Sequence, residues 1–417
     1  MKNTFLSVVM ALLLSSALYA QNDVWQATRK KPVIPAKGAF YTDAYRNVFV
    51  EAGYSGTDVS AKLELIWQQL FYGDSLTQRV YYPVGTDEAY IYDTGNRDVR
   101  SEGMSYGMMI CVQMNKQHEF DRLWKWAKTH MQHQSGARKG YFAWQMDRHG
   151  KIIDPGAASD GEEYIVTALM LAANRWGNGV GIYNYSKEAN EILRLATTKD
   201  KGDNKPITNL FNISEKQVVF VPSDEADDFT DPSYHLPAFY ELWALWADSD
   251  NAFWKQAAKK SRLMFPKFAH KDTGLMPDYA NFDGTPKHVG GHGDFRFDAW
   301  RCVMNMAVDY AWFRKSGSEP ELINKIHRFF MNQGIKTYGN QYTVEGKKLD
   351  LPHSAGLVAC NAVGVLGSNR VEAWQFIDDF YNTPIPSGLY RYYDGLLYFI
   401  SYLHLSGNFK IYKPVKP

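Results

Sequence analysis

Apolar residues recur along most of this chain at the three-to-four-residue spacing of helices that bury one face. In segment 61–71, for example, Leu63, Ile66 and Leu70 fall on one side of a helix. The same periodicity predicts further helices over 120–131, 165–176, 236–246, 253–265, 303–313, 323–330, 357–366, 371–381 and 396–405. The pattern therefore predicts about a dozen helices and only minor strands.

The segments between these helices are long and rich in Gly, Pro, Asp and aromatic residues, as in 81–98, 136–159 and 278–294. Long loops in a compact domain are usually functional. The strand–helix alternation of a parallel sheet is missing. Many antiparallel helices with long loops at one end predict an all-α toroid, in which two rings of helices are concentric.

The first twenty residues differ from the rest of the chain. Lys2 precedes an apolar run from Phe5 to Leu14, and small residues follow up to Ala20, the order of a cleaved secretory signal. The run is shorter than the about 18 residues of a membrane span. We expect a signal peptide over 1–20, a polar lead over 21–37, one domain over 38–417, and export to the periplasm or the medium. A disordered N-terminus is the alternative.

Charge and cysteine content narrow the possible partners. The 417 residues include 46 Lys and Arg against 45 Asp and Glu, a formal net charge of +1, which offers no basic footprint for nucleic acid or an anionic membrane. Cys111, Cys302 and Cys360 lie far apart, so we expect free thiols rather than disulfides or a zinc site. We expect a monomer without metal or cofactor.

Aromatic content is the unusual feature of the composition, at 15% of the residues. Core packing and sugar stacking both use large aromatic faces. Aromatics on the helical periodicity are assigned to the core, namely Trp67, Trp124, Trp176, Trp243 and Phe330. Aromatics in loops near acidic motifs are assigned to a binding surface, namely Trp144, Tyr234, Phe297, Tyr390 and Tyr393.

Glu102 lies where a polar segment meets an apolar one, which predicts partial desolvation and a raised pKa suited to a general acid. The alternative is a Glu that stabilises a helix dipole. Ser159 and Glu162 have the spacing of a capping box, which places Asp160 in a first helical turn, where the dipole lowers its pKa.

Asp298 lies among aromatic residues and has Arg301 three positions later, either as a structural ion pair or as a carboxylate with an orienting cation. Hydrolysis of a glycosidic bond requires two carboxyl groups in opposite protonation states. Glu102, Asp160 and Asp298 are therefore the candidate carboxyl groups.

One motif favours a different chemistry. Segment 103–107 matches the G-x-S-x-G elbow of serine hydrolases, with Ser105 as nucleophile. The elbow needs a hydrophobic strand before it, but residues 94–100 are mostly polar. We therefore interpret the segment as a small-residue helix face that lets another helix approach closely.

The acidic motifs belong to a wider resemblance, since the chain is similar to glycoside hydrolase family 8. It is carried by RSEGMSYGMM (100–109), ASDGEEYIVTALMLAANRW (158–176), DPSYHLPAFYELW (231–243), FDAWR (297–301), RYYDGLLY (391–398) and SGNFKIY (406–412). The family pattern has Asp where Glu162 stands and usually Ala where Val166 stands. The resemblance implies an (α/α)6 barrel and hydrolysis with inversion, with two carboxyl groups about 6.5–9.5 Å apart.

Residue by residue, the resemblance implies that Glu102 is the general acid and Asp298 the general base. It implies that Asp160 holds the distorted sugar and that Arg301 orients Asp298. The loop aromatics named above would line the cleft.

The resemblance is closest to the xylan-acting branch, and two activities are open within it. Reducing-end xylose-releasing exo-oligoxylanases block the cleft with a Leu-His-Pro-type turn, whereas endo-xylanases leave it open. Here Pro352 precedes His353 and Ser354 follows it. This order departs from that turn, but the chain keeps a His before Gly356-Leu357, and segment 38–49 is similar to the exo enzymes. The resemblance therefore favours the exo activity on xylo-oligosaccharides, with His353 contacting the terminal sugar. A plain loop histidine, an endo-xylanase on xylan and a non-catalytic carbohydrate-binding protein remain alternatives.

Overall fold

The computed structural model describes residues 29–199 and 206–414, so the signal peptide predicted over 1–20 lies outside the described residues. The part of the polar lead that is described packs on the body of the protein. Arg29 forms an ion pair with Asp378 at 2.7 Å, and the Trp374 indole donates to the Lys30 carbonyl at 2.8 Å. Within the described ranges, no helix has the length and apolar character needed to cross a membrane.

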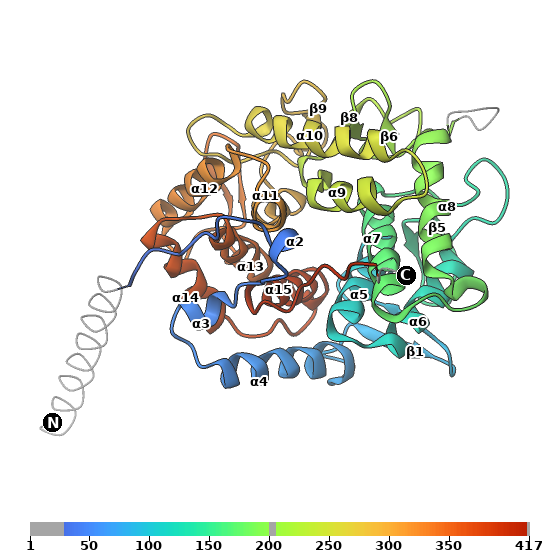
Figure 1. Ribbon diagram of the computed structural model, residues 1–417, viewed down its shortest axis with the longest axis horizontal. Helices are drawn as coiled ribbons and strands as arrows, with labels where there is room; N and C mark the ends of the chain where they lie inside the picture. Colours follow the sequence, from blue (N-terminus) through green and yellow to red (C-terminus); the bar gives the residue numbers. More distant parts are fainter. Residues whose placement is uncertain (1–28, 200–205, 415–417) are drawn as a thin grey trace, which may run out of the picture.

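Twelve α-helices of nine or more residues form two rings in the described part of the chain (Figure 1). The inner ring consists of α5 (Ser101–Met114), α7 (Ser159–Trp176), α9 (Pro237–Trp246), α11 (Arg301–Phe313), α13 (Ala355–Val363) and α15 (Arg391–Leu405). The outer ring consists of α4 (Gly56–Trp67), α6 (Gln117–Trp126), α8 (Tyr185–Thr198), α10 (Asn251–Phe268), α12 (Glu319–Gln333) and α14 (Trp374–Asn382).

Each inner helix contacts the next inner helix, α15 closes the ring on α5, and each outer helix contacts one inner neighbour. This is the (α/α)6 barrel that the periodicity and the resemblance predicted. Short helices α2 (Ala39–Thr42) and α3 (Val48–Glu51) precede the rings. Single π-helical turns extend α4 through Tyr72 and α6 through Met131, which accounts for the apolar periodicity beyond both helix ends.

The helices of the inner ring are more deeply buried than those of the outer ring. Fourteen of the eighteen residues of α7 are buried, against six of the fourteen residues of its outer neighbour α8. A helix that is covered on all sides tolerates polar residues only where they have partners. The few polar groups of the inner ring are therefore informative about function.

The small-residue face predicted for segment 103–107 is confirmed. A Cβ atom at Gly103 would overlap the ring of Tyr392 in α15, and one at Gly107 would meet Ile91 at 2.6 Å. Ser105 lies inside α5, is buried, and its hydroxyl donates to the Glu102 carbonyl at 2.7 Å. The segment is thus a helix–helix contact and not a nucleophile elbow.

Strands are minor, as predicted, and those of the described residues are short, antiparallel and confined to loops. They are β1 (Tyr81–Val84), β2 (Glu88–Ile91), β3 (Val99–Arg100), β4 (Gln145–Met146), β5 (Ile152–Asp154), β6 (Phe211–Asn212), β7 (Gln217–Val218), β8 (Phe229–Thr230), β9 (Ala280–Asn281), β10 (Gln341–Tyr342) and β11 (Lys348–Asp350). Strand β4 lies between β3 and β5. This pairing places the loop around Trp144 beside the start of α5.

Candidate active site

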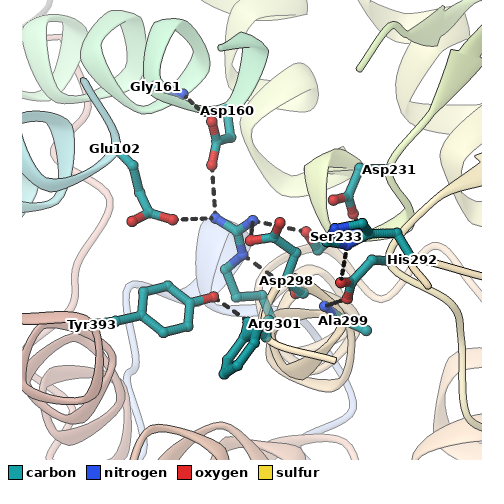
Figure 2. A network of polar contacts seen from close by, with 12 residues as sticks. Glu102, Asp160, Gly161, Asp231, Ser233, His292, Asp298, Ala299, Arg301 and Tyr393 are labelled. Atoms are coloured by element: carbon teal, nitrogen blue, oxygen red, sulfur yellow. Dashed lines mark hydrogen bonds and ion pairs between the residues drawn. The ribbon is translucent and has the colours of Figure 1, made fainter. Parts of the chain in front are cut away.

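Arg301, the first residue of α11, connects three carboxyl groups that are far apart in the sequence (Figure 2). Its Nη1 atom donates to Asp160 Oδ2 at 2.8 Å and to Glu102 Oε2 at 3.3 Å. Its Nη2 atom donates to Asp298 Oδ1 at 2.7 Å. The fold therefore gathers all three predicted carboxyl groups around one guanidinium, at the N-terminal ends of α5, α7 and α11.

Further groups hold the Arg301 side chain, which is only 3% exposed. Nη1 also donates to the Tyr106 hydroxyl at 2.7 Å, and Nη2 donates to the Ser233 hydroxyl at 3.0 Å. The guanidinium lies 5.4 Å from the centre of the Tyr234 ring. A buried cation is tolerated only when it is paired and hydrogen-bonded, and Arg301 meets both conditions.

Glu102 has the environment of a general acid. Its pKa is raised from 4.5 to about 8, mainly by burial; Arg301 opposes this rise, and the charges of Asp160 and Asp298 add to it. The Tyr392 hydroxyl donates to Glu102 Oε1 at 3.1 Å. The carboxyl is therefore protonated at neutral pH, in line with the prediction from the sequence.

Asp160 lies in the first turn of α7, as predicted, but its pKa shifts the opposite way. The Gly161 amide donates to Oδ1 at 2.8 Å, an arrangement that favours the ionised form. Burial nevertheless raises the pKa above its ordinary value, because only 5% of the side chain is exposed. The prediction of a lowered pKa is wrong, since desolvation outweighs the helix dipole and the Arg301 contact.

The predicted capping box before Asp160 is also wrong. Ser159 is the first residue of α7, the N-cap is Ala158, and no side chain caps the helix. Glu162 Oε1 instead accepts from the Phe142 amide at 2.8 Å, and burial raises the pKa of Glu162 to about 8. A tertiary contact with the loop that precedes β4 has replaced the local one.

Asp298 is the most exposed carboxyl of the three, at 27% of its side chain against 17% for Glu102 and 5% for Asp160. It opens a short 3-10 turn, Asp298–Trp300, directly before α11. Arg301 contacts its Oδ1 atom, whereas Oδ2 has no hydrogen-bond partner among the described residues. This oxygen can accept a hydrogen bond from a water molecule.

The five predicted cleft aromatics differ in how far their rings are exposed. Phe297 and Tyr390 are 45% and 75% exposed and offer ring faces to solvent. Tyr234 is only 6% exposed and lies under Arg301, so it supports the guanidinium rather than forming an open platform. Tyr393 donates to the Phe297 carbonyl at 2.9 Å. Trp144 is half-buried, with the Arg100 guanidinium 5.5 Å from its ring.

The core assignment of the other aromatics is confirmed for Trp67, Trp124, Trp243 and Phe330, which are at most 1% exposed. Trp176 is half-buried at the end of α7. All three cysteines are buried free thiols, as predicted.

His353 lies just before α13, and both of its ring nitrogens have protein partners. Nδ1 contacts the Tyr338 carbonyl at 3.0 Å, and Nε2 contacts Asp379 Oδ2 at 3.2 Å. The hydrogen bond and charge of Asp379 help to raise the His353 pKa, although burial opposes this. The structure therefore gives His353 an anchoring role in its loop, and a contact with a sugar stays a prediction.

Several site residues were missed from the sequence, namely Tyr106, Ser233, Tyr392, Asp231, Asp278 and His292. The local turn at Asp231 could have been predicted, because an Asp before Pro-Ser favours such a turn. In the structure the Ser233 amide donates to Asp231 Oδ1 at 2.7 Å. Tyr106 and Tyr392 carried none, since their role depends on how α5 and α15 pack.

The protein has two concentric rings of helices and three carboxyl groups of different exposure around one arginine. These features are typical of (α/α)6 enzymes that cleave glycosidic bonds. Comparison with known proteins makes the class specific. Residues 85–406 match the family described as glycosyl hydrolases family 8. The chain belongs to this family.

The relatives are similar over nearly their whole lengths. The chain is 46% identical to the reducing-end xylose-releasing exo-oligoxylanase Rex8A of Paenibacillus barcinonensis, over 91% of this chain and 100% of that protein. A solved structure of a Rex8A mutant with an arabinofuranosyl-xylotetraose has a TM-score of 0.88 at 44% identity, covering 92% and 100% of the two chains. A Teredinibacter turnerae xylanase with xylohexaose has a TM-score of 0.87 at 45% identity, covering 90% and 100%.

The raised pKa of Glu102 makes stability depend on pH. In the window between its ordinary value of 4.5 and about 8, the folded protein holds a proton that the unfolded chain releases. The free energy of unfolding of the wild type, relative to Glu102→Gln, is therefore expected to fall as pH rises through this window, on the order of 1 kcal/mol per pH unit at most. Urea unfolding at several pH values measures it.

Glu225→Gln, the same substitution at an exposed side chain, controls for the change in charge. A wild-type stability that rises relative to Glu102→Gln over this window would contradict the assignment of a protonated, desolvated carboxyl.

Proposed function

We propose that this protein is an inverting glycoside hydrolase that cleaves β-1,4-xylosidic bonds and releases xylose from the reducing ends of xylo-oligosaccharides. The observation that carries the chemistry is the pairing of Glu102 and Asp298 on either side of the Arg301 guanidinium. The substrate and the exo action are supported by the 46% identity to Rex8A over that protein's whole length.

In the proposed mechanism, Glu102 donates its proton to the oxygen that leaves with the reducing-end xylose. Asp298, with Oδ2 open to solvent, removes a proton from a water molecule that attacks the anomeric carbon from the opposite face. Asp160, which Arg301 and the Gly161 amide hold in place, accepts hydrogen bonds from hydroxyl groups of the distorted sugar. One proton leaves the acid and one reaches the base, so the two carboxyl groups exchange protonation states in each turnover.

Arg301 supports this mechanism by electrostatics and by geometry. Its positive charge opposes the repulsion among three neighbouring carboxyl groups, so Asp298 and Glu102 can remain close while they differ in protonation. Because the guanidinium is held by Tyr106 and Ser233 as well, it keeps this geometry without substrate. Such preorganised charge is a large part of most enzymes' rate enhancement.

An endo-acting xylanase is the second candidate, and the similarity to the Teredinibacter turnerae xylanase favours it. The order Pro352-His353-Ser354 also departs from the Leu-His-Pro-type turn. A serine hydrolase is excluded by the buried position of Ser105 inside α5.

Xylotetraose labelled at its reducing-end residue separates the two activities. The proposal predicts labelled free xylose and unlabelled xylotriose as the first products, because the bond next to the reducing end is cleaved. Glu102→Ala is the matched control and is expected to lose hydrolysis while it still binds xylotetraose. Labelled xylobiose among the first products would contradict the exo action, and full activity of Glu102→Ala would contradict the mechanism.

We also propose that the protein is exported after removal of residues 1–20. The positive, apolar and small-residue order of this segment supports the proposal. N-terminal sequencing of the protein recovered outside the cytoplasm is expected to begin at or close to Gln21. A mature chain that begins at Met1 would contradict it.

A further inference from the structure

The buried Asp278 and the half-buried His292 support the backbone beside the proposed general base; His292 and Ala299 are labelled in Figure 2. Asp278 Oδ1 accepts from the Ala299 amide at 3.0 Å, and Asp278 Oδ2 contacts His292 Nδ1 at 2.9 Å. The Asp278 side chain is 1% exposed and that of His292 is 35% exposed. Both residues belong to the loop between α10 and α11, not to the helical rings.

The Ala299 amide lies next to Asp298 in the chain, inside the 3-10 turn Asp298–Trp300. The Asp278 carboxyl therefore fixes the backbone at the place from which the Asp298 side chain projects. Arg301 holds the Asp298 carboxylate from one side, whereas Asp278 holds its backbone from the other. Neither contact alone fixes both ends of the Asp298 side chain.

The loop keeps this pair rigid. The Asp278 amide donates to the Asp294 carbonyl at 2.9 Å, and the Tyr279 amide donates to the His292 carbonyl at 2.8 Å. The His292 ring stacks on the Tyr279 ring, with 4.3 Å between centres and an interplanar angle of 17°. His292 is thus held in a single orientation that presents Nδ1 to Asp278.

The charges around the pair explain why Asp278 needs a partner. The pKa of Asp278 is raised to about 6, mainly by burial; the His292 contact opposes this rise, and the charge of Asp298 adds to it. Burial also raises the pKa of the neighbouring Asp231, and the charge of Asp298 contributes to this rise. Without His292, the Asp278 carboxyl would lose its one side-chain donor among the described residues.

We propose that Asp278 and His292 are positioning residues for Asp298, so that His292 orients Asp278, and Asp278 orients the backbone from which the base projects. The assignment rests on the proposed function, because that function makes Asp298 the base. Geometric precision is valuable at this point, since a shift of about 1 Å in a reacting group can cost about 100-fold in rate. A plain loop anchor would affect stability but not the rate per correctly folded molecule.

The experiment compares His292→Ala with the wild type on xylotetraose. We count binding-competent molecules by calorimetric titration with xylobiose and express kcat per competent molecule. His292→Ala is expected to lower kcat between about 10- and 100-fold and to leave KM within about twofold, because Asp298 is displaced but sugar contacts persist. His292→Gln, whose amide can donate to Asp278, is expected to recover most of the lost kcat.

His288→Ala is the matched control, because His288 is an exposed histidine of the same loop, and its kcat is expected to equal that of the wild type. An unchanged kcat per competent molecule in His292→Ala, or equal kcat for the Ala and Gln variants, would overturn the positioning role. Asp298→Ala tests the proposed function separately, because full activity of that variant would show that Asp298 is not the general base.

Discussion

The whole site depends on burying one arginine among three carboxyl groups. Arg301 is 3% exposed and contacts Glu102, Asp160 and Asp298 at once. One positive charge cannot balance three negative charges in a place with little water, so at least one carboxyl group must hold a proton. Glu102, which makes the longest of the three contacts with Arg301 and has a pKa of about 8, takes this role. The protonation difference that acid–base hydrolysis needs is therefore a consequence of the cluster's charge balance.

The double ring of helices supplies the geometry for this cluster. Each outer helix carries the chain back to the end of the barrel at which the next inner helix begins. The first turns of α5, α7, α11 and α15 therefore lie at the same end, and they include Glu102, Asp160 and Arg301. The close approach of α15 to Gly103 brings the Tyr392 hydroxyl to Glu102. The small residue Gly103 in α5 thus allows α15 to pack closely and also allows Tyr392 to reach Glu102.

The sequence predicted much of the fold because helical periodicity is a local property. Segment 61–71 and its counterparts mark helices through their own apolar spacing. The three carboxyl groups were also recognisable from local features. Glu102 stands where a polar segment meets an apolar one, Asp160 falls in a predicted first helical turn, and Asp298 lies among aromatic residues close to Arg301. What failed depended on tertiary contacts. Asp160 is desolvated by elements distant in sequence, and Glu162 bonds to the Phe142 amide rather than capping its own helix.

Other parts of the site could not be predicted for the same reason. Tyr234 has the sequence context of a loop platform, yet the contact of the 3-10 turn Pro232–Tyr234 with α11 places it under Arg301. Asp278 and His292 are separated by a loop whose composition only indicates a turn-rich segment, and their contact exists because the loop folds back on itself. The supporting residues of a site follow from the fold, whereas the reacting residues can be recognised beforehand.

The stereochemistry of cleavage tests the paired acid and base most directly. Xylotetraose is hydrolysed in the NMR tube, and the new reducing end of the xylotriose product is observed before its anomers equilibrate. The account predicts that the α anomer appears first, because water activated by Asp298 attacks the face opposite the β-linked leaving group. Initial formation of the β anomer would show retention and would contradict the roles of Glu102 and Asp298.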